Sequence, residues 1–512
     1  MTGPVRLTWV QPEDLVGHEL RQAVEDGRDP GPQLRAWLAA GGRPAPTRAG
    51  ASPTPAPPAL RALAEHLLDE LSTLPPPAQA PGPAAGPAPA SGPVAESGPP
   101  LPHDRGPAPA TGPAPARGPG AEPRNGSTGP EACPGAAPVI RPGTDRGAAP
   151  AGGFGAVPEG TFVGRLEAGW VGRAVGCVLG KPVEKLPLHG IRALGRAAGN
   201  WPLRTWFTAR GVPPELLAAH PWNRRSAATS LAENIDGTPE DDDLNYPLLN
   251  LLLLQRHGRG FCTADVARLW LDELPAGRTF TAERVALRNL LLGLEPPLTA
   301  RHRNPFREWI GALIRADMHG WTNPGEPARA AEQASRDAVL THTANGVYAA
   351  RFAAAAIALA AGGGGADVHA ALRAGLAVVP PRSRLAEAVR DAIDAAGRHP
   401  DFDRVVDHLH LRHGHYHWVH AVPNTALIAA ALTHADGDFS GSVCRAVSGG
   451  WDTDSNGATA GSIAGLLAGA ADRIPHHWTA PLKNRLATTV PGFDGIGFDT
   501  LAHLTAQEAA RP

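Results

Sequence analysis

Two segments of the chain combine apolar residues at helical spacing with a stripe of glycines. The first stripe is Gly169, Gly172, Gly176 and Gly180, and the second is Gly457, Gly461, Gly465 and Gly469. In a helix each set falls on one narrow face. A glycine inside a helix costs about 1 kcal/mol relative to alanine, so we expect these positions to allow close backbone approach. Arg165, Glu167 and Arg173 exclude a membrane version of the motif. The two helices are therefore predicted to pass close to each other or to a ligand at the centre of a domain.

The chain after Gly160 has the pattern of a helical protein. The Val, Ile and Thr alternation typical of strands is nearly absent, and clusters such as Pro296-Pro297 separate the periodic stretches. No fixed-period repeat is present, which disfavours a solenoid. We predict a compact, all-α, multi-helix domain with helical stretches over 163–179, 244–256, 265–274, 282–292, 308–317, 327–339, 345–361, 367–378, 384–396, 422–433 and 458–471.

A segment rich in proline and glycine divides the chain. Residues 75–158 hold 23 Pro and 16 Gly in 84 positions and keep no hydrophobic period. Such a segment cannot bury enough apolar surface to offset its chain entropy. We predict a small helical segment over 1–74, a disordered Pro/Gly/Ala-rich linker over 75–158, and the all-α domain over 159–512.

The N-terminal segment contains two candidate helices. One begins at Pro12-Glu13-Asp14, and the other, Leu60–Leu74, repeats leucines on one face. Two interpretations stay open: a small docking module, or an extension that covers part of the C-terminal domain.

Global composition mainly excludes functions. A formal net charge of −2 argues against a nucleic-acid-binding surface. Four widely spaced cysteines without a CxxC pair disfavour a disulfide framework or a zinc ribbon. The longest apolar runs, 353–361 and 248–254, are too short to span a bilayer, and no signal peptide is recognisable. We expect a cytoplasmic monomer without membrane or nucleic-acid partners.

Two acidic clusters stand at predicted helix starts. Glu240-Asp241-Asp242-Asp243 precedes an apolar helix, and the run Gly449–Gly457 places D-x-D-S before the second glycine-striped helix. The first cluster alone is also explained by a solvated acidic helix start, because anions suit a helix N-terminus. Hard cations such as Mg²⁺, Mn²⁺ and Ca²⁺ demand clustered oxygen ligands. One shared metal centre explains both clusters together.

Other catalytic motifs fail on their spacing. The second cluster resembles the start of an EF-hand loop, but the terminal Glu of such a loop would fall near Ile463. Gly176–Lys181 is not a P-loop, because Val175 and Pro182 occupy positions that require Gly and Ser or Thr. No G-x-S-x-G elbow is present. Without a thiol or serine constellation, we expect a metal-activated water as the nucleophile.

Five runs, in the same order, resemble the ADP-ribosylglycohydrolase family: GRAVGCVLGKPVE, PEDDDLNYPLL, IGALIRADMHG, DAVLTHTANGVY and GGWDTDSNGATAGSIAG. The resemblance covers about 160–475, and the last run is the most specific. It implies an all-α domain with a centre of two Mg²⁺ ions, or Mn²⁺ in some members, that hydrolyses the glycosidic bond between ADP-ribose and its acceptor. The implied partner is an ADP-ribosylated protein or a small ADP-ribosyl substrate.

The resemblance assigns metal ligands by position. The family's first metal motif, a Thr or Ser followed by two Asp, falls on Asp241, Asp242 and Asp243. Asp241 thus replaces the hydroxyl residue, and Leu244 replaces the Thr that usually follows. The second motif falls on Asp452, Asp454 and Ser455.

Three further positions are notable within this resemblance. Glu184 matches the acidic residue that closes the first run and sits over the ribose, whereas the family's central Asp in that run is Cys177 here. Pro247 falls inside an expected helix, where a first-turn position would tolerate it.

The implied mechanism uses two ions that chelate the ribose hydroxyls, orient C1 and position a water. A carboxylate, Glu184 or Asp242, would assist proton transfer. The implied substrate contacts are Gly180, His342, Asn345, Gly346, His420, Asn424, Gly450 and Trp451. Two alternatives stay open. One is a catalytically weak ADP-ribose-binding protein, signalled by Asp241 and Leu244; the other is a hydrolase of another N-glycoside or a phosphoester on the same scaffold.

Three other features have two interpretations each. The histidine-rich run suggests a Zn²⁺ or Ni²⁺ site or, in our preference, a polar loop that leads to a helix; its members are His408, His410, His413, His415, His417 and His420. His342 either contacts substrate or belongs to a capped helix end. Arg315 and Asp317 are interpreted as a structural ion pair rather than a phosphate contact.

Overall fold

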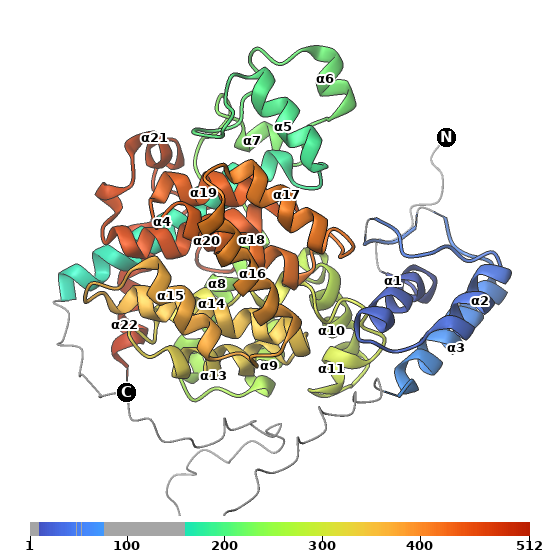
Figure 1. Cartoon of the computed structure of the whole chain (residues 1–512). Coiled ribbons are helices and arrows are strands. Elements are labelled where there is room, and N and C mark those ends of the chain that lie inside the picture. The colour runs from blue at the N-terminus through green and yellow to red at the C-terminus, as the bar shows by residue number, and fades with distance from the viewer. Residues whose placement is uncertain (1–9, 48, 53, 76–158, 512) are drawn as a thin grey trace, which may run out of the picture. The chain divides into compact units, whose positions relative to one another are not determined.

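The computed structural model describes residues 10–511 apart from 48, 53 and 76–158. All described residues belong to one compact unit. The predicted linker lies outside the described residues except for Pro75, so the predicted boundaries of the three parts stay predictions. The described part is built of helices, with isolated β-bridges and no strand. The prediction of an all-α protein is therefore confirmed (Figure 1).

The N-terminal segment contains three helices: α1 (Pro12–Glu25), α2 (Gly31–Ala39) and α3 (Pro58–Thr73). Helices α1 and α3 correspond to the two predicted ones. Helix α2 was not predicted; Trp37 is its only buried residue, and Leu34 and Leu38 on the same face are exposed.

The C-terminal domain contains longer core helices joined by short helical turns. The core and surface helices are α4 (Glu159–Gly180), α5 (Leu188–Ala197), α8 (Asp242–His257), α9 (Thr263–Glu273), α10 (Thr281–Leu291), α13 (Pro327–Ala338), α14 (Ala344–Gly362), α15 (Val368–Ala377), α16 (Arg384–Arg398), α17 (Phe402–His413), α18 (Ala421–His434), α19 (Phe439–Ser448), α20 (Thr453–Ala468) and α22 (Phe498–Ala510). The short ones are η1 (Lys181–Val183), α6 (Pro214–Ala219), α7 (Ala227–Ser230), η2 (Ala276–Arg278), α11 (Leu298–Arg301), η3 (Ile310–Ala312), α12 (Asp317–Trp321), η4 (Ala471–Arg473), α21 (His476–Thr479) and η5 (Ala480–Leu482).

One predicted helix is wrong. Over 308–317 the structure has only the short turn η3, and α12 begins at Asp317. At the start of this stretch the backbone pairs with a distant segment: the Ile310 amide donates to the Val419 carbonyl at 2.9 Å, and the Ala421 amide donates to the Glu308 carbonyl at 3.0 Å. Apolar periodicity carries no information about such pairing.

Helices α4 and α20 are in backbone contact along their glycine stripes. A Cβ atom built on Gly176 would lie 1.8 Å from the Gly457 carbonyl oxygen, and one on Gly172 would lie 2.1 Å from that of Gly461. The stripes therefore serve the approach of one helix to the other. Gly469 is an exception, because it ends α20 in the left-handed conformation at φ +86°.

Helix α14 passes through the core. Among the described residues it is the one helix long and apolar enough to cross a membrane, but 78% of its apolar stretch is buried inside the protein. Asn345, Tyr348 and Arg351 interrupt its sequence, so the uninterrupted apolar run is shorter than the helix. Burial against neighbouring helices explains its apolar character without a lipid environment.

Candidate metal centre

Three helix ends bring the acidic residues of both clusters together. The end of α4, continued by η1, positions Glu184, while the starts of α8 and α20 position the two aspartate clusters. Ligand atoms form two groups, each within 4.8 Å: Cys177 with Asp241 and Asp243, and Glu184 with Asp452 and Asp454. The Ser455 hydroxyl donates to Asp243 Oδ2 at 3.3 Å and joins the groups.

The loop before α20 turns sharply to present Asp452. Gly450 and Trp451 both have positive φ, +79° and +57°, a conformation that is uncommon for a bulky residue. The Trp451 ring is held by stacking on His410, with ring centroids 3.9 Å apart and an interplanar angle of 5°. His410 is fixed in turn because its Nε2 lies 2.8 Å from the Gly449 carbonyl oxygen.

Asn424 of α18 anchors the same loop. Its Oδ1 accepts hydrogen bonds from the Asp452 amide at 3.0 Å and from Asn456 Nδ2 at 2.7 Å. Its Nδ2 donates to the His420 and Trp418 carbonyls. The side chain therefore positions the second acidic cluster relative to α18.

The start of α8 is held by a buried arginine. The structure places Pro247 in the second turn of α8 rather than the first, where it leaves the Asp243 carbonyl without its helical donor. Arg173 Nε donates to that carbonyl at 2.7 Å, and its Nη1 donates to Asp317 Oδ2 at 2.7 Å. Arg173 thus supplies the hydrogen bond that Pro247 cannot donate, and it connects α4 with α8.

The clustered carboxylates repel one another. Burial and the neighbouring Asp241 raise the pKa of Asp243 well above its usual range, and burial together with Asp454 does the same to Asp452. Burial and the Glu184 carboxylate raise the pKa of Asp454 to about 7. The two acidic clusters therefore carry more negative charge than the neighbouring cations balance.

The donor set fits a hard divalent cation. It consists of carboxylate oxygens, which Mg²⁺ and Mn²⁺ prefer. Asp243 Oδ1 is buried and accepts no hydrogen bond; Arg173 Nη2 lies 3.5 Å from it. Cys177 does not fit such an ion, because burial raises the pKa of its thiol well above the usual value, and only the thiolate binds metal.

The predicted substrate residues fall into two sets. Gly180 packs against the Thr453 backbone, and it lies with Asn424, Gly450 and Trp451 beside the acidic clusters. In the second set Asn345 and His420 contact Glu308, whereas His342 packs with Gly346 and lies 3.9 Å from Glu283.

In this second set, Asn345 Nδ2 donates to Glu308 Oε1 at 3.3 Å, and His420 Nε2 lies 3.4 Å from Glu25 and 3.7 Å from Glu308. His342 is buried with its Nδ1 2.6 Å from the Thr341 hydroxyl, and Gly346 packs on its ring.

Arg315 and Asp317 do not pair with each other, which corrects that interpretation. Arg315 contacts Asp337 at 3.1 Å and Glu283 at 2.8 Å, whereas Asp317 pairs with Arg173. All of these side chains are buried. Arg315 and Asp317 each pair with residues of other helices, and their closeness in the sequence does not reveal this.

The histidine-rich run is split between a helix and a loop. His408, His410 and His413 lie on α17, so the prediction of a loop holds only for the residues after it. His408 contacts Asp391 at 2.9 Å, and His417 contacts the Thr47 carbonyl at 3.0 Å. Among the described residues, the candidate metal clusters contain no histidine.

Sequence reasoning missed the roles of Lys181, Arg173, His410 and Asn223. Lys181 Nζ bonds to Asp241 Oδ2, and Asn223 Nδ2 donates to Glu184 Oε2 at 2.7 Å. Arg173 and Lys181 could have been noticed in the sequence, because each is a charged residue within a glycine-striped helix or at its end. Asn223 carried none.

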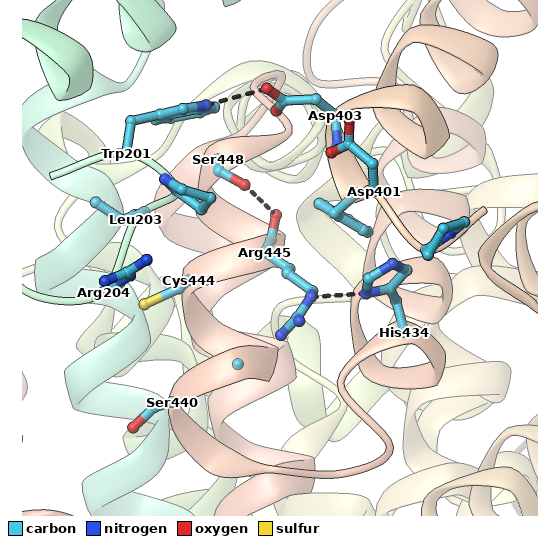
Figure 2. Close-up of a pocket in the computed structure, with 14 residues that line it drawn as sticks. Trp201, Leu203, Arg204, Asp401, Asp403, His434, Ser440, Cys444, Arg445 and Ser448 are labelled. Carbon is cyan, nitrogen blue, oxygen red and sulfur yellow. Dashed lines mark hydrogen bonds between the residues drawn. The ribbon is translucent and has the colours of Figure 1, made fainter.

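A separate cavity of about 360 Å³ lies between the loop 201–204, the start of α17, the end of α18 and α19. Figure 2 shows Arg445 directed at His434, with Trp201 bonded to Asp403 at the rim. Within the described part of the chain, none of the predicted site residues lines it.

A model of the ADP-ribosylglycohydrolase family matches residues 159–509. The chain belongs to the ADP-ribosylglycohydrolase family. This confirms the resemblance and extends it almost to the end of the chain. No curated protein matches the sequence. Among solved structures, one described as an "ADP-ribosylglycohydrolase-related protein complex" is 20% identical, with a TM-score of 0.43, and covers 68% of this chain and 98% of that chain. ADP-ribosylglycohydrolases act on ADP-ribosylated substrates and are generally metal-dependent, and this member has acidic clusters able to bind a metal.

Proposed function

We propose that the protein is a metal-dependent hydrolase that cleaves the glycosidic bond of ADP-ribose attached to a protein side chain or another acceptor. The observation that carries the proposal is the convergence of Glu184, Asp243, Asp452 and Asp454 at three helix ends. Family membership supplies the substrate class.

The metal would be Mg²⁺ or Mn²⁺, held by carboxylates of the two clusters. When bound it supplies Lewis-acid chemistry: it orients the ribose hydroxyls and lowers the pKa of a water. The family resemblance implies two ions. Because Lys181 contacts Asp241, the number of ions bound by this chain has to be measured.

Proton transfer is assigned to Glu184 and Asp242. Glu184 is half-buried, and Asn223 Nδ2 at 2.7 Å and Lys185 Nζ at 2.6 Å fix its two oxygens. Burial and the neighbouring Asp241 raise the pKa of Asp242 well above its usual range. Asp242 is therefore suited to donate a proton to the leaving group, and Glu184 to accept one from the attacking water.

The test is Mg²⁺-dependent release of ADP-ribose from a panel of Arg-, Ser- and nucleotide-linked substrates. We expect turnover of at least one linkage, with activity lost on chelation by EDTA. Replacing both Asp452 and Asp454 by Ala removes two buried ligands and is expected to abolish Mg²⁺ binding and turnover together. Asp436→Asn changes an exposed carboxylate and serves as the matched control.

Two other outcomes would replace the proposal. Tight ADP-ribose binding by isothermal titration calorimetry without turnover of any linkage would indicate a binding protein, consistent with Asp241 at the hydroxyl position. Turnover of another N-glycoside or a phosphoester alone would indicate a different hydrolase on this scaffold. Full activity of the double Ala variant would exclude the metal centre as the catalytic site.

A further inference from the structure

Lys181 brings a fixed positive charge into the acidic site. It is the first residue of η1, directly after the glycine-striped helix α4, and its side chain is buried. Its ammonium contacts Asp241 Oδ2 and lies 3.4 Å from the Glu240 carbonyl oxygen. The close packing of Gly180 on the Thr453 backbone fixes where this lysine enters the site.

Both oxygens of the Asp241 carboxylate have a hydrogen-bond donor. Its Oδ1 accepts a hydrogen bond from the Asp243 amide at 3.0 Å, which caps α8, and its Oδ2 is taken by Lys181. Each oxygen therefore already has a donor, and a metal ion bound here would lie beside the Lys181 ammonium. The third member of this ligand group, Cys177, offers sulfur, which a hard cation such as Mg²⁺ or Mn²⁺ does not prefer.

The two ligand groups therefore differ in charge. In the group of Cys177, Asp241 and Asp243, Lys181 neutralises Asp241, while Arg173 lies 3.5 Å from Asp243. The other group contains three carboxylates and only Lys185, which is half-exposed and pairs with Glu184.

Asp452 and Asp454 thus have no cationic partner among the ion pairs of the described residues. Carboxylates packed this closely need a cation, because their repulsion in a poorly hydrated site is strong. The need for a metal is concentrated in this group.

We propose that the Lys181 ammonium takes the place of one divalent cation in this site, so that the protein binds a single metal ion, on the side of Glu184, Asp452 and Asp454. The inference rests on the proposed metal-dependent function and concerns its ion count. Asp241 and Lys181 act as a pair: the extra carboxylate at position 241 is balanced by the lysine at position 181.

The test counts metal ions rather than turnover. Full-length protein stripped with EDTA is titrated with Mn²⁺, and bound ions are counted by isothermal titration calorimetry and by electron paramagnetic resonance, which also detects coupling between adjacent Mn²⁺ ions. We expect one Mn²⁺ per chain without spin coupling. Lys181→Met keeps the side-chain length but removes the charge, frees Asp241, and is expected to give two coupled Mn²⁺ ions.

Lys483→Met is the matched control, since Lys483 pairs with Asp236 at the surface and its loss should leave one Mn²⁺ per chain. Two coupled ions in the wild type would overturn this inference and leave the proposed hydrolysis intact. A single ion in a folded Lys181→Met variant, checked by circular dichroism, would also overturn it. One bound ion without release of ADP-ribose would instead overturn the proposed function alone. No bound ion would overturn both.

Discussion

Asp243 and Asp454 show what a metal site costs at the level of single residues. Both are buried among other carboxylates that raise the pKa of each. Without a cation, ionising them in the folded state is unfavourable, whereas in the unfolded chain water solvates them. The site thus trades stability of the metal-free protein for affinity for a cation.

This trade predicts that Asp454→Asn stabilises the metal-free protein. The amide keeps the shape and removes one repelling charge, so its melting temperature in EDTA is expected to exceed that of the wild type by several degrees. With saturating Mg²⁺ the order should reverse, because the wild type gains more binding energy. Differential scanning calorimetry in both conditions measures this. An equal shift in both conditions would contradict it, and Asp436→Asn should show none.

The meeting of the two acidic clusters could be predicted from sequence, but their neutralising partners could not. Adjacent aspartates at helix starts are visible in the sequence itself. Lys181 lies 60 residues from Asp241 and Arg173 lies 70 residues from Asp243. Their contacts depend on how α4 packs against the start of α8, which no local pattern encodes. Pro247 is explained only once Arg173 is seen to replace its missing donor.

At the level of elements, the crossing of α4 and α20 positions the site. Gly176 faces the Gly457 carbonyl, and Gly180 faces the Thr453 backbone beside the aspartates of α20. Any side chain on this face forces the helices apart and displaces Glu184 from Asp452 and Asp454. The packing of the two helices and the geometry of the candidate metal centre therefore depend on the same glycines.

Gly176→Ala is expected to destabilise the protein and weaken metal binding. The added Cβ would lie 1.8 Å from a backbone oxygen that cannot move alone, and overpacking of this kind costs about 1–3 kcal/mol or more. Gly164→Ala in the same helix is the control: its Cβ meets nothing within 4 Å, so it should stabilise by about 0.5–1 kcal/mol. Urea unfolding and Mn²⁺ titration compare the two. Equal effects at both positions would show that the stripe is not a packing device.

The long apolar helices could be predicted from the spacing of their apolar residues, whereas α5, α17, α19 and α22 were not predicted although each has a buried face. Helices α4, α8, α14 and α20 were recognised by periodicity, and the glycine stripes indicated which pair makes contact. The helix predicted over 308–317 is wrong because apolar residues here are buried without forming a helix. The backbone at the start of this stretch pairs with 419–421. Periodicity detects burial on one face and not the partner of the backbone.

At the scale of the whole molecule, ion pairs connect the N-terminal segment with the C-terminal domain. Arg307 contacts Glu19 at 2.7 Å and Asp26 at 2.6 Å, and Arg303 contacts Asp69 at 2.9 Å. These contacts favour an extension that covers part of the domain over an independent docking module. The sequence left this open, because charged residues on a short helix suit solvent and a partner equally well.

A further contact between the N-terminal segment and the C-terminal domain, that of Glu25 with His420, makes the stability pH-dependent. Burial lowers the pKa of His420, but the carboxylates of Glu25 and Glu308, 3.4 and 3.7 Å from its Nε2, outweigh this and raise it above its usual value. Arg384 balances Glu308, whereas Glu25 is shared between His420 and Arg21, whose Nε lies 3.8 Å from it. A raised histidine pKa stabilises the fold fully below the unfolded value of 6.5, and the contribution is lost as the pH rises through the folded pKa.

Glu25→Gln should therefore lower the free energy of unfolding by about 1–3 kcal/mol near pH 6, the usual cost of leaving a buried polar group without its partner. At pH 9 the same variant should lose less, because His420 loses its charge as the pH rises through its folded pKa. Urea unfolding at both pH values measures the difference. Glu65→Gln, on the exposed side of α3, should change neither value. A loss of equal size at both pH values would show that Glu25 acts by packing and not through the charge of His420, and the N-terminal segment would then be held independently of pH.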